Sequence, residues 1–269
     1  MNKIHLIKSD CLVEMANIPD NSIDMVLCDL PYGVLNKGNK SVQWDRIIPF
    51  EPLWEQYERI IKDNGAIVLF AQGMFTAKLM MSNTKMWRYN LVWDKINRPT
   101  GFLNANRCPL RIHEDILVFY KKQPTYNPQF TIGEKSHSRG KCGNGIGGAK
   151  NRCYGDFKQT EATLTNEKYP NSIISIPKEH SNFYHPTQKP VALLEYLIKT
   201  YTNEGEIVLD NCSGSFSTAI AAINTNRCFI GIEKDEKYFN IGVERIIRRV
   251  KYDIFSSSIK LIINGKVQE

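Results

Sequence analysis

The residues whose types and spacing could support chemistry stand first at the end of a short apolar run. This run spans residues 23–28, and Asp29, Leu30, Pro31 and Tyr32 follow it directly. An acid, a proline and an aromatic residue at this place can form a site, because open α/β sheets bind ligands at the carboxyl ends of their strands. Asp and Pro are equally the residues of an ordinary turn. The segment alone therefore leaves both a reactive site and a simple chain reversal open.

A second group of polar residues follows another apolar run, which Asp210 ends. Ser213, Gly214 and Ser215 form a turn of small residues before an alanine-rich helical segment. Glu233 ends the next apolar run, about 20 residues further along. Small residues let a backbone approach a ligand closely, and the second acid accepts hydrogen bonds from ribose hydroxyls. This pattern is typical of sites for nucleotide-like ligands.

The absence of a full phosphate-binding motif narrows the choice of ligand. The turn lacks a complete Gly-x-Gly-x-x-Gly pattern, so a ligand without a pyrophosphate group fits it better. S-adenosylmethionine is such a ligand, because its ammonium and sulfonium groups favour a carboxylate such as Asp210 and its ribose favours Glu233. The two acids are also compatible with helix N-caps or with ordinary polar residues at strand ends.

Size and composition exclude several classes of protein. The chain has 269 residues, enough for one large α/β domain with an insertion, and its net charge of +7 suits a polyanionic partner without requiring one. Its seven cysteines include no Cys-x-x-Cys pair, which argues against a disulfide framework and a metal site and favours a reducing, cytoplasmic location. No segment is apolar over the length of a membrane span, and the N-terminal residues do not resemble a signal peptide, so no membrane partner is expected.

Short apolar runs and helix-like segments alternate along the chain. Strands are expected at residues 23–28, 66–70, 89–93, 115–120, 206–210 and 227–232. Helices are expected at residues 51–62, 73–84, 191–202, 215–224 and 235–251. Several of the strands are apolar at nearly every position, as strands buried on both faces are. The alternation predicts a doubly wound α/β fold with a mainly parallel sheet.

The stretch at residues 121–184 interrupts this alternation. It is rich in Gly, Lys, Arg, Ser and Asn and shows little periodicity. Long segments of this kind are either functional or flexible surface loops. Their positive charge, which includes Lys135, Arg139 and Lys141, favours contact with phosphate groups. We therefore expect a single domain over residues 1–269 with a loop-rich, substrate-facing insertion.

Together these motifs resemble the amino-group DNA methyltransferases, which methylate N6 of adenine or N4 of cytosine. Asp-Leu-Pro-Tyr at 29–32 matches the catalytic tetrapeptide of that family. The segment at residues 185–198, which begins His-Pro-Thr-Gln-Lys-Pro, is similar to the one that precedes its cofactor strand, and residues 210–219 resemble its cofactor loop. The order, with the catalytic motif first and the cofactor loop last, is the β arrangement of the family. The resemblance therefore implies the S-adenosylmethionine-dependent methyltransferase fold with a permuted motif order.

The cofactor loop departs from the pattern of the family. Asn211 and Cys212 replace a Pro and a Phe, and Phe216 replaces a Gly. If the position of Phe216 needs a positive φ or close contact with the ligand, a large side chain there weakens cofactor binding. A catalytically impaired relative that still binds DNA is therefore an alternative to an active enzyme.

The resemblance also implies roles for individual residues. Asp29 and the carbonyl of Leu30 would accept hydrogen bonds from the target amine, while Pro31 would fix the turn. Tyr32 would stack on a base extruded from the duplex. The residues implied for S-adenosylmethionine are Asp10, Cys11, Asp29, Thr187, Lys189, Asp210, Ser213, Gly214, Ser215 and Glu233. Asp10 is explained equally well as a helix N-cap, and no metal ion is implied.

Double-stranded DNA is the partner that the resemblance implies. Arg98 and Arg107 lie among basic and aromatic residues and are predicted phosphate contacts, as are the basic residues of the insertion. Asp as the first residue of the tetrapeptide favours N6 of adenine, with N4 of cytosine as the alternative. An RNA or small-molecule methyltransferase agrees less well with the basic insertion. A homodimer and a cognate restriction endonuclease are partners that the sequence leaves open.

Overall fold

The computed structural model describes residues 2–35, 42, 44–96, 98–137, 150–151, 155–156, 164–179, 184–251 and 259–268. The chain forms two compact units. The larger consists of Met1–Asn127 with Ser172–Glu269, and the smaller of Pro128–Asn171.

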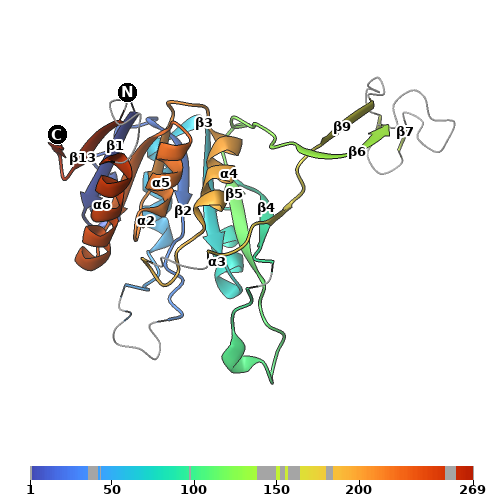
Figure 1. The fold of residues 1–269 in the computed structure, drawn as a ribbon, viewed down its shortest axis with the longest axis horizontal. Coiled ribbons are helices and arrows are strands. Elements are labelled where there is room, and N and C mark those ends of the chain that lie inside the picture. Colours follow the sequence, from blue (N-terminus) through green and yellow to red (C-terminus); the bar gives the residue numbers. More distant parts are fainter. Residues whose placement is uncertain are drawn as a thin grey trace. The chain divides into compact units, whose positions relative to one another are not determined.

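In the part of the chain that the structure describes, the larger unit is built on a ten-stranded sheet (Figure 1). Its strands are β1 (Asn2–Lys8), β2 (Ile23–Cys28), β3 (Ile61–Ala71), β4 (Trp87–Asp94), β5 (His113–Phe119), β10 (Ile173–Ser175), β11 (Ile207–Asp210), β12 (Cys228–Glu233), β13 (Ile259–Ile263) and β14 (Lys266–Val267). Their order across the sheet is β10-β4-β5-β3-β2-β11-β12-β1-β13-β14. Neighbours run parallel, except that β5 is antiparallel to β3 and β4, and β14 is antiparallel to β13. The expectation of a mainly parallel, doubly wound sheet is confirmed.

Helices cover both faces of this sheet (Figure 1). They are α1 (Cys11–Met15), α2 (Phe50–Ile60), α3 (Met74–Ser82), α4 (Val191–Tyr201), α5 (Ser217–Asn224) and α6 (Glu236–Lys251). Helices α1, α2 and α3 contribute to one apolar cluster, and α4, α5 and α6 to the other. No helix among the described residues combines the length and the apolar character that crossing a membrane requires.

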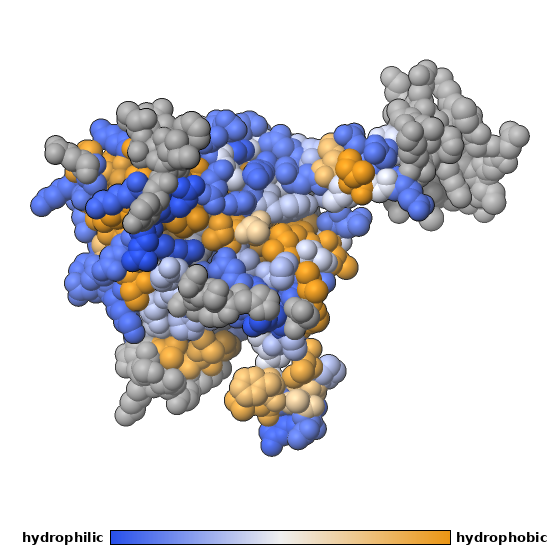
Figure 2. Space-filling view, in the orientation of Figure 1, coloured by the Kyte–Doolittle hydropathy of each residue, from blue (hydrophilic) through white to orange (hydrophobic). Residues whose placement is uncertain are grey.

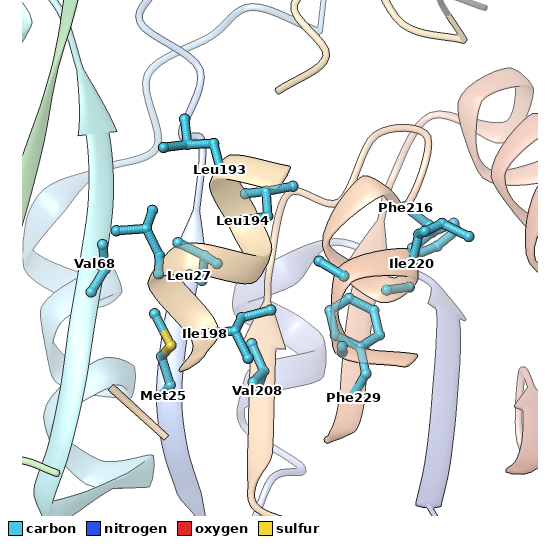
Figure 3. Packing of buried hydrophobic residues seen from close by; sticks show 14 of the residues in the cluster. Met25, Leu27, Val68, Leu193, Leu194, Ile198, Val208, Phe216, Ile220 and Phe229 are labelled. Carbon is cyan, nitrogen blue, oxygen red and sulfur yellow. The ribbon is translucent and has the colours of Figure 1, made fainter. Parts of the chain in front are cut away.

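Strand β2 shows why the central strands are apolar at nearly every position. Met25 and Leu27 belong to the cluster under α4, which Figure 3 shows together with Leu194 and Ile198 of that helix. The intervening Val26 belongs to the cluster on the opposite face. Because successive side chains of a strand point to opposite faces, a strand covered on both sides is apolar at nearly every position. The exception in β2 is Asp24, which is buried and paired with Lys62 at 2.6 Å.

The direction in which the chain leaves the central strands changes between β2 and β11. From β2 the chain continues to β3 on one side, and from β11 to β12 on the other. Strands β1, β2, β11 and β12 are parallel, so their carboxyl ends lie at the same edge of the sheet. Doubly wound sheets bind their ligands at this edge, where the strand order reverses.

The smaller unit lies within the expected insertion. In it β6 (Thr131–His137) pairs antiparallel with β9 (Leu164–Lys168), and β7 (Lys150–Asn151) pairs with β8 (Gly155–Asp156). The rings of Phe130 and Tyr169 pack with their centroids 4.8 Å apart at the base of the β6–β9 hairpin. The two ends of the expected insertion, residues 121–127 and 172–184, belong to the larger unit instead, in which β10 pairs with β4.

Candidate active site

Four acidic residues stand at the carboxyl edge of four parallel strands. Asp10 follows β1, Asp29 follows β2, Asp210 ends β11 and Glu233 ends β12. Asp29 and Asp210 come from the two strands on either side of the point where the strand order reverses. The fold therefore brings together the two strand ends that the sequence marks as chemically interesting.

Asp29 is held by two neighbours, one on each carboxylate oxygen. The hydroxyl of Tyr32 donates a hydrogen bond of 2.8 Å to Oδ1, and Nζ of Lys189 forms an ion pair with Oδ2. Nζ of Lys189 also lies 3.2 Å from Oε2 of Glu114. The ring of Tyr32 stacks on Phe75 with centroids 4.8 Å apart. One face of Tyr32 is thus supported by the protein, as a residue that stacks on a base requires.

The ion pair at Asp29 extends into a chain of alternating charges. Lys95, whose side chain is 2% exposed, lies 2.6 Å from the second oxygen of Glu114. Burial alone lowers the pKa of Lys189, but the negative charges of Asp29 and Glu114 outweigh burial and hold this pKa above its ordinary value. Burial raises the pKa of Asp29, and Lys189 counteracts this only in part. For Glu114 the two lysines outweigh burial, so its pKa is lowered.

The segment after the tetrapeptide is fixed by Asp45. The side chain of Asp45 is buried, and its two oxygens accept hydrogen bonds from the backbone N–H groups of Gly33, Val34 and Leu35 at 2.9, 2.8 and 2.6 Å. Gly33 has a positive φ of 68°, which few other residues adopt. Leu30 anchors the other side of the turn, since its side chain is buried in the core. The tetrapeptide is therefore held from both ends.

Asp210 organises the loop that follows β11. Its Oδ2 accepts a hydrogen bond of 2.6 Å from the hydroxyl of Thr218, and its Oδ1 accepts one of 3.1 Å from the N–H of Cys212. The hydroxyl of Ser213 donates to the backbone carbonyl of Asp210 at 2.7 Å. Burial raises the pKa of Asp210 to about 6. A buried carboxyl that several donors of one loop share sets the shape of that loop.

Glu233 connects this loop to the next strand. Its oxygens accept hydrogen bonds of 2.7 Å each from the N–H groups of Gly214 and Asp235. Burial raises the pKa of Glu233 to about 7. Gly214 has a positive φ of 52°, and a Cβ at this position would lie 3.6 Å from the ring of His185. The hydroxyl of Ser215 donates to the side chain of Gln188 at 3.3 Å, which joins the loop to the segment before α4.

An aromatic cluster lies beside Gly214. The ring of His185 is 4.8 Å from that of Trp44 and 4.1 Å from that of Tyr238, measured between centroids. The hydroxyl of Thr187 lies 3.1 Å from Nδ1 of His185. Burial lowers the pKa of His185 to about 4, so its ring is neutral at physiological pH. The rings of Trp44 and Tyr238 are tilted by 57° and 66° relative to that of His185, so the three form an uncharged aromatic cluster with ring edges and faces at different angles next to the acidic loop.

Phe216 adopts the backbone conformation that the glycine of related loops would favour. Its φ is 57°, yet its side chain is fully buried and packs against Phe239 of α6 with centroids 5.8 Å apart. Gly231 and Gly242 leave room for the ring, because a Cβ at either position would overlap it. Figure 3 shows Phe216 beside Ile220 in the packed core. The large side chain is therefore accommodated in the core, at the expense of a strained backbone of about 1–3 kcal/mol.

Asp10 serves as the N-cap of α1. Its Oδ1 accepts a hydrogen bond of 3.0 Å from the N–H of Leu12, and its Oδ2 lies 2.9 Å from Nζ of Lys234. Cys11 follows it, and the neighbouring thiol of Cys212 lowers the pKa of Cys11. These contacts link the end of β1 to the loop after β11. Among the described residues no cluster of three or more His, Cys, Asp or Glu side chains is suited to a metal ion.

The predicted DNA contacts are only partly within the described structure. Arg98 and Arg107 lie in the loop between β4 and β5, which joins the sheet at the edge that carries the acids. The backbone of Lys135 lies in β6, but its side chain is outside the described residues. Arg139 and Lys141 are outside them entirely.

Three residues that the sequence did not single out belong to this site. Glu114 is the second residue of β5, and because β5 is antiparallel its beginning lies at the same edge as the ends of the parallel strands. Asp45 lies before α2 and binds the backbone that follows the tetrapeptide. Phe75 lies in α3 and stacks on Tyr32. The sequence signal that could have identified Asp45 is the Trp-Asp pair at residues 44–45, which places an aromatic residue and an acid shortly after the tetrapeptide.

The edge of the sheet has the features that S-adenosylmethionine requires. Carboxylates from three neighbouring strands suit a ligand with a positive charge and ribose hydroxyls, and Gly214 presents its backbone without a side chain. The aromatic cluster suits a planar ring. Fold and site together define an S-adenosylmethionine-dependent methyltransferase.

Comparison with known proteins identifies the family. The family model described as DNA methylase, for N6 and N4 methyltransferases, matches residues 23–244, and the chain belongs to this family. The chain is 28% identical over 255 residues to the DNA adenine methyltransferase YhdJ of Escherichia coli (strain K12), which covers 90% of this chain and 82% of that protein. It is 27% identical over 265 residues to the Type II methyltransferase M2.MboI of Moraxella bovis, with coverage of 90% and 86%.

Solved structures agree with this fold. The complex of M1.HpyAVI with S-adenosylmethionine aligns with a TM-score of 0.57 at 23% identity and covers 90% of this chain and 98% of that one. The cytosine-N4-specific PvuII DNA methyltransferase aligns with a TM-score of 0.66 at 14% identity and covers 99% and 96%. The predicted fold, family and cofactor are therefore confirmed, whereas the roles of individual residues stay predictions.

Proposed function

We propose that this DNA methyltransferase transfers a methyl group from S-adenosylmethionine to the exocyclic N6 amine of adenine in a specific sequence of double-stranded DNA. The observation that carries the proposal is the environment of Asp29. Its carboxylate stands at the point where the strand order reverses, next to the acidic loop of Asp210, with a stacked Tyr32 beside it. The acid as first residue of the tetrapeptide and the similarity to an adenine methyltransferase of Escherichia coli support adenine as the target.

Asp29 and Leu30 activate the amine by accepting hydrogen bonds from its two N–H groups. The lone pair of an aromatic amine is delocalised into the ring, so the amine is a weak nucleophile. A hydrogen bond from one N–H to Oδ1 of Asp29 and one from the other to the carbonyl of Leu30 draw the nitrogen toward tetrahedral geometry. Bound S-adenosylmethionine supplies an electrophilic methyl group. The contribution of the protein is positioning and prearranged polar groups.

The structure supports a specific exchange of partners at Asp29. In the protein alone, the hydroxyl of Tyr32 donates to Oδ1, while Lys189 holds Oδ2. The target amine takes the position at Oδ1, and Lys189 keeps the carboxylate in place through the other oxygen. Methyl transfer gives a positively charged methylated amine, which must lose one proton to become the neutral product. Asp29, whose pKa burial raises, is the base beside it.

The other predicted residues bind the cofactor or shape its site. Glu233 fixes Gly214 and offers its remaining lone pairs to ribose hydroxyls. Asp210 sets the loop that contains Ser213 and Ser215, and its charge favours the cationic end of the ligand. Asp10, Cys11 and Thr187 complete the residues proposed to contact the ligand, whereas Lys189, also predicted from the sequence, shapes the site by holding the carboxylate of Asp29.

The proposal extends to partners and location. The smaller unit, with Lys135, Arg139 and Lys141, contacts the DNA target, as do Arg98 and Arg107 of the larger unit. The enzyme works in the cytoplasm, where duplex DNA is available. A homodimer and a cognate restriction endonuclease are further proposed partners, because Type II methyltransferases are among its relatives.

Cytosine N4 is the second candidate target, because the family includes enzymes of both kinds. The experiment that separates the two uses bacterial DNA and S-adenosylmethionine labelled in the methyl group, followed by digestion to nucleosides. We expect the label in N6-methyladenine. Label in N4-methylcytosine alone would refute the adenine assignment, and the absence of label from all nucleosides would support a catalytically impaired relative.

A further inference from the structure

The loop between β4 and β5 extends their hairpin beyond the sheet (Figure 1). The N–H of Lys95 donates to the carbonyl of Ile112 at 2.9 Å, and Thr100 and Arg111 exchange two backbone hydrogen bonds of 2.7 and 3.0 Å. At its base, Lys95 is paired with Glu114, which reaches Asp29 through a single lysine. The described part of the loop, which leaves out residue 97, is therefore a hydrogen-bonded extension of the sheet that begins at the ion-pair chain of the proposed catalytic carboxylate.

The tip of this loop is organised but apolar. Gly101, with a φ of 87°, leads into the short 3₁₀ helix Phe102–Asn104, and Arg107 donates its N–H to the carbonyl of Asn104 at 2.8 Å. Phe102 is 76% exposed and Leu103 is 85% exposed. Figure 2 shows apolar and strongly hydrophilic residues side by side at the tip of this loop. Two adjacent large apolar side chains on an ordered tip indicate a surface that a partner covers.

The charge of the loop identifies the kind of partner. Residues 95–112 include Lys95, Arg98, Arg107 and Arg111 and no acidic residue. Lys95 is buried, whereas Arg107 and Arg111 are exposed. A second copy of the same loop would repel this one, because both carry the same positive charge. Apolar side chains flanked by arginines suit a nucleic acid, whose phosphates attract the arginines and whose base steps accept apolar wedges.

We propose that Phe102 and Leu103 form a wedge that inserts at a base step of the duplex, next to the target nucleotide, while Arg107 and Arg111 contact the flanking phosphates. The inference rests on the proposed function, in which the target base leaves the duplex to reach Asp29. Extrusion requires unstacking and unpairing of that base. The wedge compensates for the lost stacking and so lowers the barrier to extrusion, from a loop that joins the sheet beside the catalytic carboxylate.

The test compares two duplexes that differ only in the target base pair. The site is first located by sequencing modified bases in DNA from cells that produce the protein. One duplex then carries this site fully paired, and the other carries the target base opposite a mismatched base, which removes much of the cost of extrusion. The variants are Phe102→Ser with Leu103→Ser, and Met81→Ser as the matched control, because Met81 is 73% exposed on α3.

We expect the double variant to lose about tenfold or more of kcat/KM on the paired duplex, and about twofold or less on the mismatched duplex. Met81→Ser should behave as wild type on both. Equal losses on the two duplexes would show an ordinary contact surface and overturn the wedge, as would an unchanged kcat/KM on the paired duplex. Failure of the proposed function is distinguishable, because the sequencing step would then find no N6-methyladenine at a defined site in DNA from cells that produce the protein.

Discussion

Replacing Lys189 by Met removes the only cation that contacts both Asp29 and Glu114 among the described residues. The side chains of Lys189, Asp29 and Glu114 are 8%, 22% and 14% exposed, so solvent screens their charges weakly. Two unit charges about 4 Å apart interact by about 4 kcal/mol at an effective dielectric constant of about 20. Loss of a neighbouring opposite charge typically raises a carboxyl pKa by about 1–3 units. Breaking a buried ion pair from one side costs about 3–5 kcal/mol of stability.

The assay is the pH dependence of kcat together with the affinity for S-adenosylmethionine. Asp29 acts as a carboxylate, and a higher pKa means that a higher pH is needed to ionise it. We therefore expect the acid limb of kcat to move up by about 1–3 pH units in the Lys189→Met variant. Cofactor affinity, measured by calorimetric titration, should change little. Adding Glu114→Gln should lower stability further, because Glu114 still pairs with Lys95 and its loss would leave that buried lysine without its carboxylate.

The control for this prediction is Lys122→Met, which breaks the exposed pair between Lys122 and Asp63 at 2.6 Å. Exposed pairs contribute about 0–1 kcal/mol, so its stability and pH profile should match the wild type. An unmoved acid limb in Lys189→Met, combined with a strongly weakened affinity for S-adenosylmethionine, would refute the reasoning. That result would instead support a direct contact of Lys189 with the cofactor.

Three further predictions concern the loop and its supports. Gly242→Ala should lower the free energy of unfolding by about 1–3 kcal/mol, because the new Cβ would overlap the ring of Phe216. Denaturant titration should show a smaller loss when Phe216 is also replaced by Ala, and equal losses in both backgrounds would contradict this. The pKa of Glu233 is about 7 in the folded protein against an ordinary 4.5, so its contribution to stability is present below pH 4.5 and is lost as the pH rises through about 7. The melting temperature of wild type should accordingly fall more between about pH 5 and pH 8 than that of Glu233→Gln, and parallel curves would disprove the assignment. Asp45→Ala should lower kcat/KM for DNA by about tenfold or more, with Asp45→Asn intermediate, since three N–H groups lose their acceptor; wild-type kinetics in Asp45→Ala would exclude this positioning role.

The elements that could be predicted from the sequence are those with a distinct local pattern. Strand β2 has the bounds expected from its largely apolar run, because a strand covered on both faces is apolar at nearly every position. Strands β1 and β13 were not expected, since their runs include lysines and, in β1, alternate with polar side chains. The antiparallel direction of β5 is set by its pairing with β3 and β4, which no local pattern records.

The same distinction applies to the site. Asp29, Asp210 and Glu233 were found because each follows an apolar run, and the sheet then places all three at one edge. Lys189 is separated from Asp29 by 160 positions, so the sequence motif could mark it as important but could not show which carboxylate it pairs with. Glu114 could be found only once the direction of β5 was known.

The central claim is that the carboxylate of Asp29 activates the target amine beside a separately built cofactor site. The most direct test measures methyl transfer to DNA and binding of S-adenosylmethionine in the Asp29→Ala variant. The account predicts that transfer falls by about 10²-fold or more while the dissociation constant of the cofactor stays close to that of wild type. Substantial residual transfer, or a loss of cofactor binding that accounts for the loss of activity, would contradict it.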